Sequence, residues 1–169
     1  DWFELCNYGT NPADLTGFYL TDSFTNKFKF QIPAGYVIPP HGFLLVWADG
    51  KNTNGTPELH ISFKLSQAGE SLGLYGADGN PVDYVIYGPQ TNDVSQGRYR
   101  DGAAGLYFMT TPSPRTNNVI PNTAPVLTPI GNISIYAGQT LHFTATAADA
   151  EGAFQSLTFS LEPGAPAGA

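Results

Sequence analysis

The sequence predicts an all-β protein, and three observations support that prediction. Short apolar runs recur between residues 2 and 110. The 19 Gly and 14 Pro that interrupt the chain leave little room for helices. The stretch 71–88, SLGLYGADGNPVDYVIYG, contains two alternating runs on either side of a glycine-rich turn. Regular short strands separated by turn residues are typical of a β-sandwich or a barrel.

The stretch 71–88 is the clearest of these elements. Its apolar residues fall at period two, the spacing that places every second side chain on one face of a sheet. They are Leu72 and Leu74 in the first run, and Val82, Tyr84 and Ile86 in the second. The Asp-Gly pair at 78–79 supplies the turn of a hairpin. The stretch therefore indicates a β-scaffold rather than a catalytic motif.

Further strand-like runs are expected along the same part of the chain. All the expected strands lie at residues 2–6, 18–21, 28–32, 43–48, 60–65, 71–75, 82–87, 95–99 and 106–110. The run from Phe43 to Trp47 is continuously apolar, as a central strand covered on both faces would be.

The amino-acid composition changes after Met109, where the segment TTPSPRTNNVIPNTAP is rich in Pro, Asn and Thr. Such a segment favours a semi-extended linker or a domain edge. We predict a β-sandwich at 1–118, a Pro/Asn linker at 119–125, and a second β-sandwich segment at 126–169. The second segment is expected to be truncated, because an immunoglobulin-like sandwich needs about 100 residues. The whole chain is expected to be a piece of a longer protein.

Charge and hydropathy argue against two classes of partner. The net charge is −7, from 14 acidic and 7 basic residues without a basic cluster, whereas nucleic-acid binding normally needs a basic stripe. No apolar run approaches the roughly 20 residues of a membrane-spanning helix. The one cysteine, Cys6, cannot form an internal disulfide and is expected to be a partly buried structural thiol.

The sequence contains partial matches to catalytic motifs, but none has the surrounding pattern that the chemistry requires. Residues 69–73, GESLG, match the G-x-S-x-G pattern of a nucleophile elbow, which needs a strand, a tight turn and a helix; Ser71 instead opens a strand of a hairpin. His41, His60 and His142 show no spacing typical of zinc ligands. We therefore predict no catalytic residue and a chain that is not an enzyme. A third alternative is an enzyme domain that uses Asp residues and a metal.

Aromatic side chains beside turns are the candidates for ligand contact. They are Tyr8, Tyr36, Tyr87 and Tyr99. If exposed, such rings can stack on sugars or contact a protein.

Several blocks, in order and spacing, resemble the lamin tail domain of bacterial multi-domain proteins over residues 1–118. They are DWFELCN, DLTGFYLTD, IPAGYVIPPHGFLLVWADG, FKLSQAGESLGLYGADGNPVDYVIYG, SQGRYRDG and TTPSPRTNN. The strand that usually precedes the first block is missing, and Leu106-Tyr107 stands where the family has an aromatic pair led by Trp. The resemblance implies an immunoglobulin-like β-sandwich without catalytic residues of its own, carried by a secreted or surface protein.

The segment from Ala124 onward resembles the start of cadherin-like or immunoglobulin-like repeats of bacterial surface proteins. That resemblance implies that Asn122, Asp149 and Glu151 sit where such modules place calcium ligands. Because Ca²⁺ takes six to eight oxygens, a complete site would need a neighbouring module.

Together these observations predict a non-enzymatic extracytoplasmic scaffold or adhesion module, within a larger bacterial protein that is extracellular or at the cell surface. Its expected partners are a protein or polysaccharide at the cell surface and neighbouring β-domains of the parent chain. No cofactor is expected unless calcium binds near the linker. The alternative is a carbohydrate-binding accessory module of a secreted hydrolase.

Overall fold

The computed structural model describes residues 1–52, 58–151, 155–161 and 163–164. Every element of regular secondary structure in these ranges is a strand, which confirms the all-β prediction. The described residues contain no helix that is long and apolar enough to span a membrane. The strands are β1 (Trp2–Cys6), β2 (Ala13–Asp14), β3 (Tyr19–Thr21), β4 (Phe30–Gln31), β5 (Val37–Ile38), β6 (Phe43–Trp47), β7 (Leu59–His60), β8 (Glu70–Tyr75), β9 (Pro81–Tyr87), β10 (Ser95–Arg98), β11 (Leu106–Met109), β12 (Val126–Leu127) and β13 (Ala147–Ala148).

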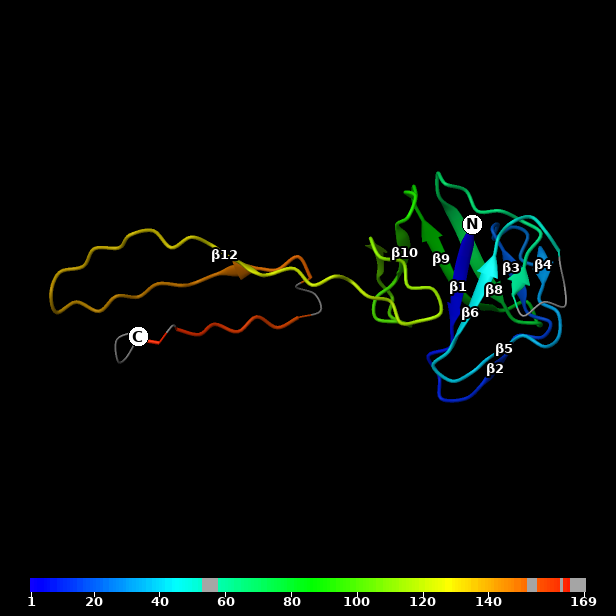
Figure 1. Ribbon diagram of the computed structural model, residues 1–169, viewed down its shortest axis with the longest axis horizontal. Helices are drawn as coiled ribbons and strands as arrows, with labels where there is room; N and C mark the ends of the chain where they lie inside the picture. Colours follow the sequence, from blue (N-terminus) through cyan, green and yellow to red (C-terminus); the bar gives the residue numbers. More distant parts are fainter. Residues whose placement is uncertain (53–57, 152–154, 162, 165–169) are drawn as a thin grey trace. The chain divides into compact units, whose positions relative to one another are not determined.

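The chain divides into two compact units, Asp1–Ile120 and Pro121–Ala169. The first unit contains two larger sheets, seen as overlapping layers in Figure 1. One has the order β1-β6-β7, and we call it the tryptophan sheet because it carries Trp2 and Trp47. The other has the order β4-β3-β8-β9 and is called the hairpin sheet. The pairs β2-β5 and β10-β11 complete this unit.

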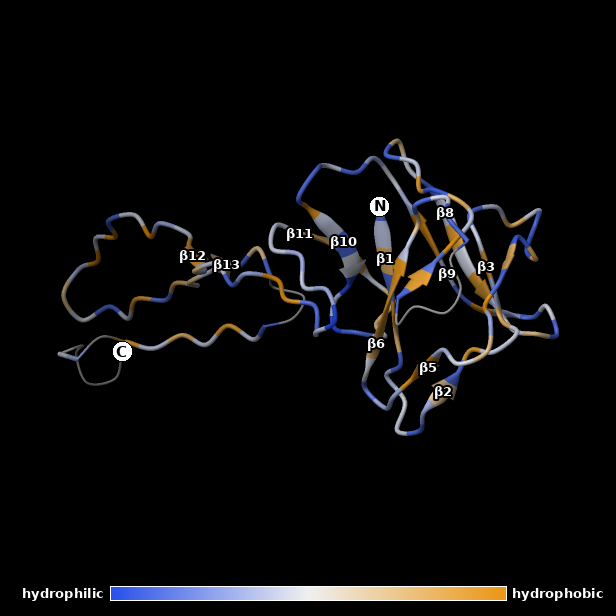
Figure 2. Cartoon of the chain, turned by 45° about the vertical axis from the view of Figure 1, so that its right-hand side comes forward, coloured by the Kyte–Doolittle hydropathy of each residue, from blue (hydrophilic) through white to orange (hydrophobic). Residues whose placement is uncertain are grey.

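The core of the first unit lies between the two larger sheets. Val46 and Leu59 enter it from the tryptophan sheet, and Leu20 and Phe30 enter it from the hairpin sheet, all at most 5% exposed. Hydrophobic residues are concentrated along β6 and β9 in Figure 2. Complete burial of an aliphatic or aromatic side chain stabilises a fold by about 1.5–3 kcal/mol. The burial of Val46, Leu59, Leu20 and Phe30 therefore holds the two layers together.

The register of the hairpin sheet separates the two apolar runs of the stretch 71–88. Leu72 and Leu74 face the core and pair with Val85 and Asp83, and the register shifts between Leu74 and Tyr75. The outer face consequently carries the other apolar set of β9, at 55–66% exposure: Val82, Tyr84 and Ile86. The expected hairpin is confirmed, and its two apolar runs lie on opposite faces of the sheet.

Strand β6 is central and covered on both faces, as its continuous apolar run predicted. Val46 faces the core at 0% exposure, while Leu45 faces the other way and is still only 8% exposed. The segment after β11 lies against this outer side, where the Arg115 backbone N–H donates to the Glu4 carboxylate at 2.5 Å.

The expected strands at 28–32 and 60–65 are shorter than predicted. Only Phe30–Gln31 and Leu59–His60 are strands in those regions. Ile61 and Phe63 are nevertheless core residues, at 0% and 4% exposure, because their side chains continue the inward alternation beyond the end of β7. Strands β2 and β5 were not predicted.

The second unit has one described strand pair, in which Val126 pairs with Ala148 and Leu127 with Ala147. Its large apolar side chains are mostly exposed, including Ile133, Ile135 and Phe143 at 49–55%. The last residues of the predicted second segment, 165–169, lie outside the described residues.

Candidate functional site

The four tyrosines proposed as ligand contacts occupy different environments. Tyr8 is 70% exposed, whereas Tyr36 is only 8% exposed and belongs to the core. The Tyr36 hydroxyl donates to the Glu58 carbonyl at 3.3 Å. Tyr87 and Tyr99 are half-buried. The expectation that Tyr36 is exposed is therefore wrong, and the widely exposed ring of this set is that of Tyr8.

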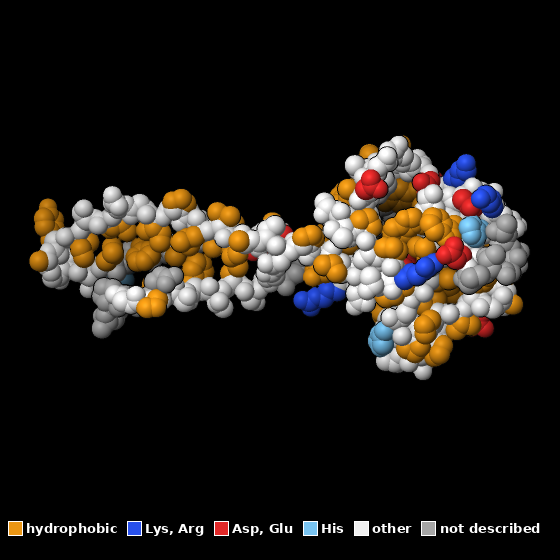
Figure 3. Space-filling view, in the orientation of Figure 1, with side chains coloured by type: hydrophobic (Ala, Val, Ile, Leu, Met, Phe, Trp, Pro, Cys, Tyr) orange, Lys and Arg blue, Asp and Glu red, His pale blue; other side chains and the backbone are white. Residues whose placement is uncertain are grey.

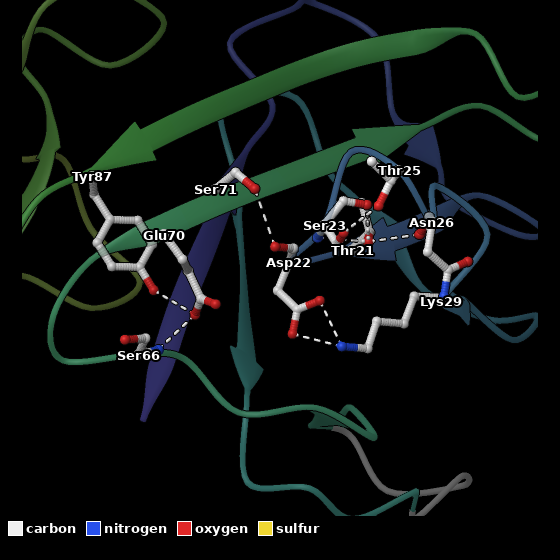
Figure 4. Close-up of polar contacts among 10 residues, drawn as sticks. All are labelled: Thr21, Asp22, Ser23, Thr25, Asn26, Lys29, Ser66, Glu70, Ser71 and Tyr87. Atoms are coloured by element: carbon white, nitrogen blue, oxygen red, sulfur yellow. Dashed lines mark hydrogen bonds and ion pairs between the residues drawn. The ribbon is translucent and has the colours of Figure 1, made fainter.

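Tyr87 belongs to a hydrogen-bonded group at the end of the hairpin sheet, drawn in Figure 4. Its hydroxyl donates to Glu70 Oε1 at 2.8 Å, and the Ser66 backbone N–H donates to the same oxygen at 2.5 Å. Burial, followed by the hydrogen bond to Glu70, raises the pKa of Tyr87. These hydrogen bonds tie the start of β8 and the end of β9 to the loop that precedes β8.

Ser71, His41 and His60, all in the first unit, lie in separate surroundings. The Ser71 hydroxyl lies within β8 and donates to the Asp22 carbonyl at 3.1 Å (Figure 4). His41 is exposed in a turn with a φ of 53°, and His60 Nδ1 is hydrogen-bonded to Asp49 Oδ2 at 2.9 Å. His142 belongs to the second unit. In the described ranges, no three His, Cys, Asp or Glu side chains are grouped so that they could hold a metal ion.

The residues expected to bind calcium are used largely in local hydrogen bonds. Glu151 accepts from the N–H and hydroxyl of Thr123, at 3.0 and 2.8 Å, and these bonds lower the pKa of Glu151. Asp149 Oδ1 accepts from the Glu151 N–H at 2.8 Å, and Asn122 Oδ1 accepts from Gln155. Asp149 Oδ2 is buried without a hydrogen-bond partner. This donor set is well short of the six to eight oxygens that calcium takes, so these residues do not fit calcium by themselves.

A row of three aromatic side chains crosses the outer face of the tryptophan sheet. Trp2 on β1 pairs with Trp47 on β6, and Trp47 pairs with His60 on β7. Directly paired residues share a face, and it is the outer face because the preceding pair, Val46 and Leu59, is in the core. The Trp47 and His60 rings are stacked, with centroids 6.4 Å apart and planes 20° apart.

Acidic and basic side chains fix this row in place. Trp47 Nε1 donates to Glu58 Oε2 at 2.9 Å, and Glu58 forms an ion pair with Arg115 at 2.5 Å. Asp49 holds His60 and also pairs with Lys51 at 3.5 Å. Burial opposes ionisation of Asp49, but hydrogen bonds from His60 and the Lys51 N–H outweigh it and lower the pKa of Asp49. Figure 3 shows hydrophobic side chains over β1 and β6 beside adjoining acidic and basic groups.

A second exposed surface lies on the outer face of β9, which is an edge strand. We call it the β9 face; it consists of Val82, Tyr84, Ile86 and Phe24. The Phe24 and Tyr84 rings meet edge to face at 5.5 Å. Beside the β9 face is a pocket of about 380 Å³, where Arg98 pairs with Asp83 at 2.7 Å and donates to the Tyr84 carbonyl at 3.3 Å.

Cys6 is a half-buried free thiol. Burial, with smaller effects from Asp101 and Glu4, raises its pKa to about 11. The thiolate is the reactive form of cysteine, so this environment suppresses thiol chemistry at neutral pH.

Two facing β-layers around one apolar core make the first unit a β-sandwich. A family model described as the lamin tail domain matches residues 1–89, more than half of the sequence, and the chain therefore belongs to the lamin tail domain family, which has an immunoglobulin-like β fold. The match confirms the resemblance over those residues and does not identify the second unit. No curated protein and no solved structure matches the chain.

Proposed function

We propose that the chain is a non-enzymatic interaction module of a larger bacterial protein, located outside the cell or at its surface. The observation that carries this proposal is the β9 face, where Val82, Tyr84 and Ile86 are 55%, 58% and 66% exposed at alternate positions of one strand. Contiguous apolar side chains of this kind mark sites of macromolecular contact.

The chemistry of the β9 face suits a protein partner. Its aromatic and aliphatic side chains resemble the composition of interface centres, which are depleted in charge and enriched in aromatic residues. The neighbouring charges, Asp83 and Arg98, form an ion pair with each other and so offset one another. Membership of the lamin tail family supports the scaffold role and the bacterial surface setting.

The second unit is proposed to be the start of a cadherin-like or immunoglobulin-like repeat, which would separate neighbouring domains of the parent protein. Support comes from its antiparallel strand pair and its alternating apolar residues. Calcium is proposed here only as an ion that a following module would help to bind, because the acidic residues of this segment are already used in local hydrogen bonds.

The proposal is tested with the purified full chain, labelled with a fluorophore and titrated onto intact bacterial cells with and without protease treatment. We expect saturable, protease-sensitive binding that the double variant Tyr84→Ser/Ile86→Ser weakens by about tenfold or more, as at interface hot spots. Val37→Ser is the matched control, because Val37 is 50% exposed on β5, outside the hairpin sheet. Binding that both variants retain overturns the proposal, as does a hydrolytic activity abolished by one point change.

Carbohydrate binding is the second candidate function, as a module accessory to a secreted hydrolase. The observation that favours it is the aromatic row on the tryptophan sheet rather than the set of four tyrosines.

A further inference from the structure

We infer that the aromatic row Trp2, Trp47 and His60, with its bordering ion pairs, binds a neutral saccharide chain. This inference deepens the second candidate function and is independent of the β9 face. The family match and the sequence patterns assign no role to these residues.

The row has the extent of a small saccharide site. Its three members lie on adjacent strands in one line of the ladder, and adjacent strands are about 4.8 Å apart. The line of aromatic side chains therefore extends for roughly 10 Å across the sheet. A pyranose ring has a face of C–H groups that packs on an aromatic ring, so a line of rings suits consecutive sugar units.

The row is held rigidly before any ligand arrives. The indole N–H of Trp47 is bound to Glu58 at 2.9 Å, and the imidazole of His60 is bound to Asp49 at 2.9 Å. Arg115 fixes Glu58 in turn, at 2.5 Å. Ordering side chains on binding costs free energy, and these contacts have already ordered two of the three rings.

The polar border matches hydroxyl groups. Sugar hydroxyls both donate and accept hydrogen bonds, and the border supplies carboxylate acceptors together with guanidinium and ammonium donors. The Glu58 and Arg115 side chains are 39% and 59% exposed, and that of Lys51 is 68% exposed. The outer parts of these side chains therefore face the solvent beside the rings.

The charges of the border indicate that the saccharide is neutral. Asp49 pairs with Lys51, and Glu58 pairs with Arg115. Glu4, on the same face as Trp2, adds a third carboxylate beside Arg115, so no excess of positive charge is present to select phosphate, sulfate or uronate groups. A protein is a poorer occupant than a saccharide, because the rings are half-buried rather than projecting as anchors, and they are bordered by charges.

The test is affinity electrophoresis of the full chain in gels containing a neutral polysaccharide, either hydroxyethyl cellulose, glycol chitin or galactomannan, with polygalacturonate and heparin as anionic probes. Trp2 and Trp47 are the only two tryptophans of the sequence, so intrinsic fluorescence reports titration with the matching hexasaccharide. We expect retardation by at least one neutral polysaccharide and a change in tryptophan emission. Trp2→Ala and His60→Ala should each weaken binding by about tenfold or more.

Two controls separate this inference from the proposed protein contact. Unfolding midpoints of Trp2→Ala and His60→Ala identify a variant that loses binding through misfolding, and Trp2→Phe should restore part of the binding lost in Trp2→Ala. The variant Tyr84→Ser/Ile86→Ser should keep saccharide binding while losing the protease-sensitive cell binding. Absence of retardation by all three neutral polysaccharides overturns the inference. So does retardation by the anionic probes alone, or binding that folded Trp2→Ala and His60→Ala variants retain.

Discussion

Replacing Gly69 by Ala is expected to destabilise the first unit strongly, through two effects that the structure separates. Gly69 has a φ of +100°, and a Cβ added there would lie 2.5 Å from the Tyr87 carbonyl oxygen and 2.8 Å from Gly88 backbone carbons. Holding a non-glycine residue in such a conformation costs about 1–3 kcal/mol. Forcing the backbone of β9 aside adds about another 1–3 kcal/mol, as in other overpacked sites.

Gly35 is the matched control for this substitution. Its φ is +99°, nearly the same as that of Gly69, but a Cβ added at Gly35 has no neighbouring atom within 4 Å. Gly35→Ala should therefore show only the conformational cost, about 1–3 kcal/mol. The smaller conformational freedom of Ala in the unfolded chain applies to both variants, so it cancels in the difference between them.

Urea unfolding followed by tryptophan fluorescence measures both variants, since Trp2 and Trp47 report on the first unit. The free energy of unfolding of Gly69→Ala should be lower than that of Gly35→Ala by about 1–3 kcal/mol, equivalent to several degrees in Tm for a unit of this size. Equal losses of unfolding free energy in the two variants would refute the argument that close backbone approach, rather than φ alone, requires glycine immediately before β8.

Three further predictions concern the chemistry of single groups. Because the pKa of Cys6 is about 11 in the folded chain against 9.0 for an ordinary thiol, a disulfide reagent should react slowly at pH 8 and much faster after denaturation; the Cys6 contribution to stability should fall as pH rises from 9 through 11. Thr21→Val should cost about 1–3 kcal/mol in chemical denaturation, because the fully buried hydroxyl of Thr21 bonds the backbone of its loop at 2.8–3.0 Å, whereas Thr25→Val, at an exposed hydroxyl, should change little. Replacing a chelator by millimolar Ca²⁺ should leave the Tm of the isolated chain unchanged, since Glu151 already accepts two hydrogen bonds; an increase in Tm would show that calcium binds without a neighbouring module.

Local patterns predicted the strands well but not the faces to which their residues belong. The Asp-Gly turn and the alternating runs were enough to locate β8 and β9. The face of each run depends on the register shift at Leu74 and Tyr75, which no local pattern expresses. Strands β2 and β5 are two residues long and lie among turn residues, so their sequence carries almost no period. Tyr36 was a candidate for ligand contact because it lies beside a Pro-Ala-Gly turn, but the residue before β5 is buried in the core.

The aromatic row could not be predicted from the sequence for a related reason. Trp2 shares a face with Glu4 and Cys6, opposite Phe3 and Leu5, and this much could be read from alternation. Alignment with Trp47 and His60 depends on an antiparallel pair and on the parallel pairing of β6 with β7. A parallel neighbour is set by a long connection rather than by a turn, so its register cannot be inferred from nearby residues.

The Arg98 contact at the open edge of β9 has a consequence for how copies of this domain behave when crowded. An unpaired edge strand is a template on which another chain can add its own strand and begin an aggregate. The Arg98 guanidinium already occupies the Tyr84 carbonyl, at 3.3 Å, and places a charged group beside it. An incoming strand would have to break this hydrogen bond and displace the charged Arg98 side chain. Tandem or densely packed copies can therefore present the apolar β9 face to a partner's side chains while resisting the edge-to-edge growth that leads to fibrils.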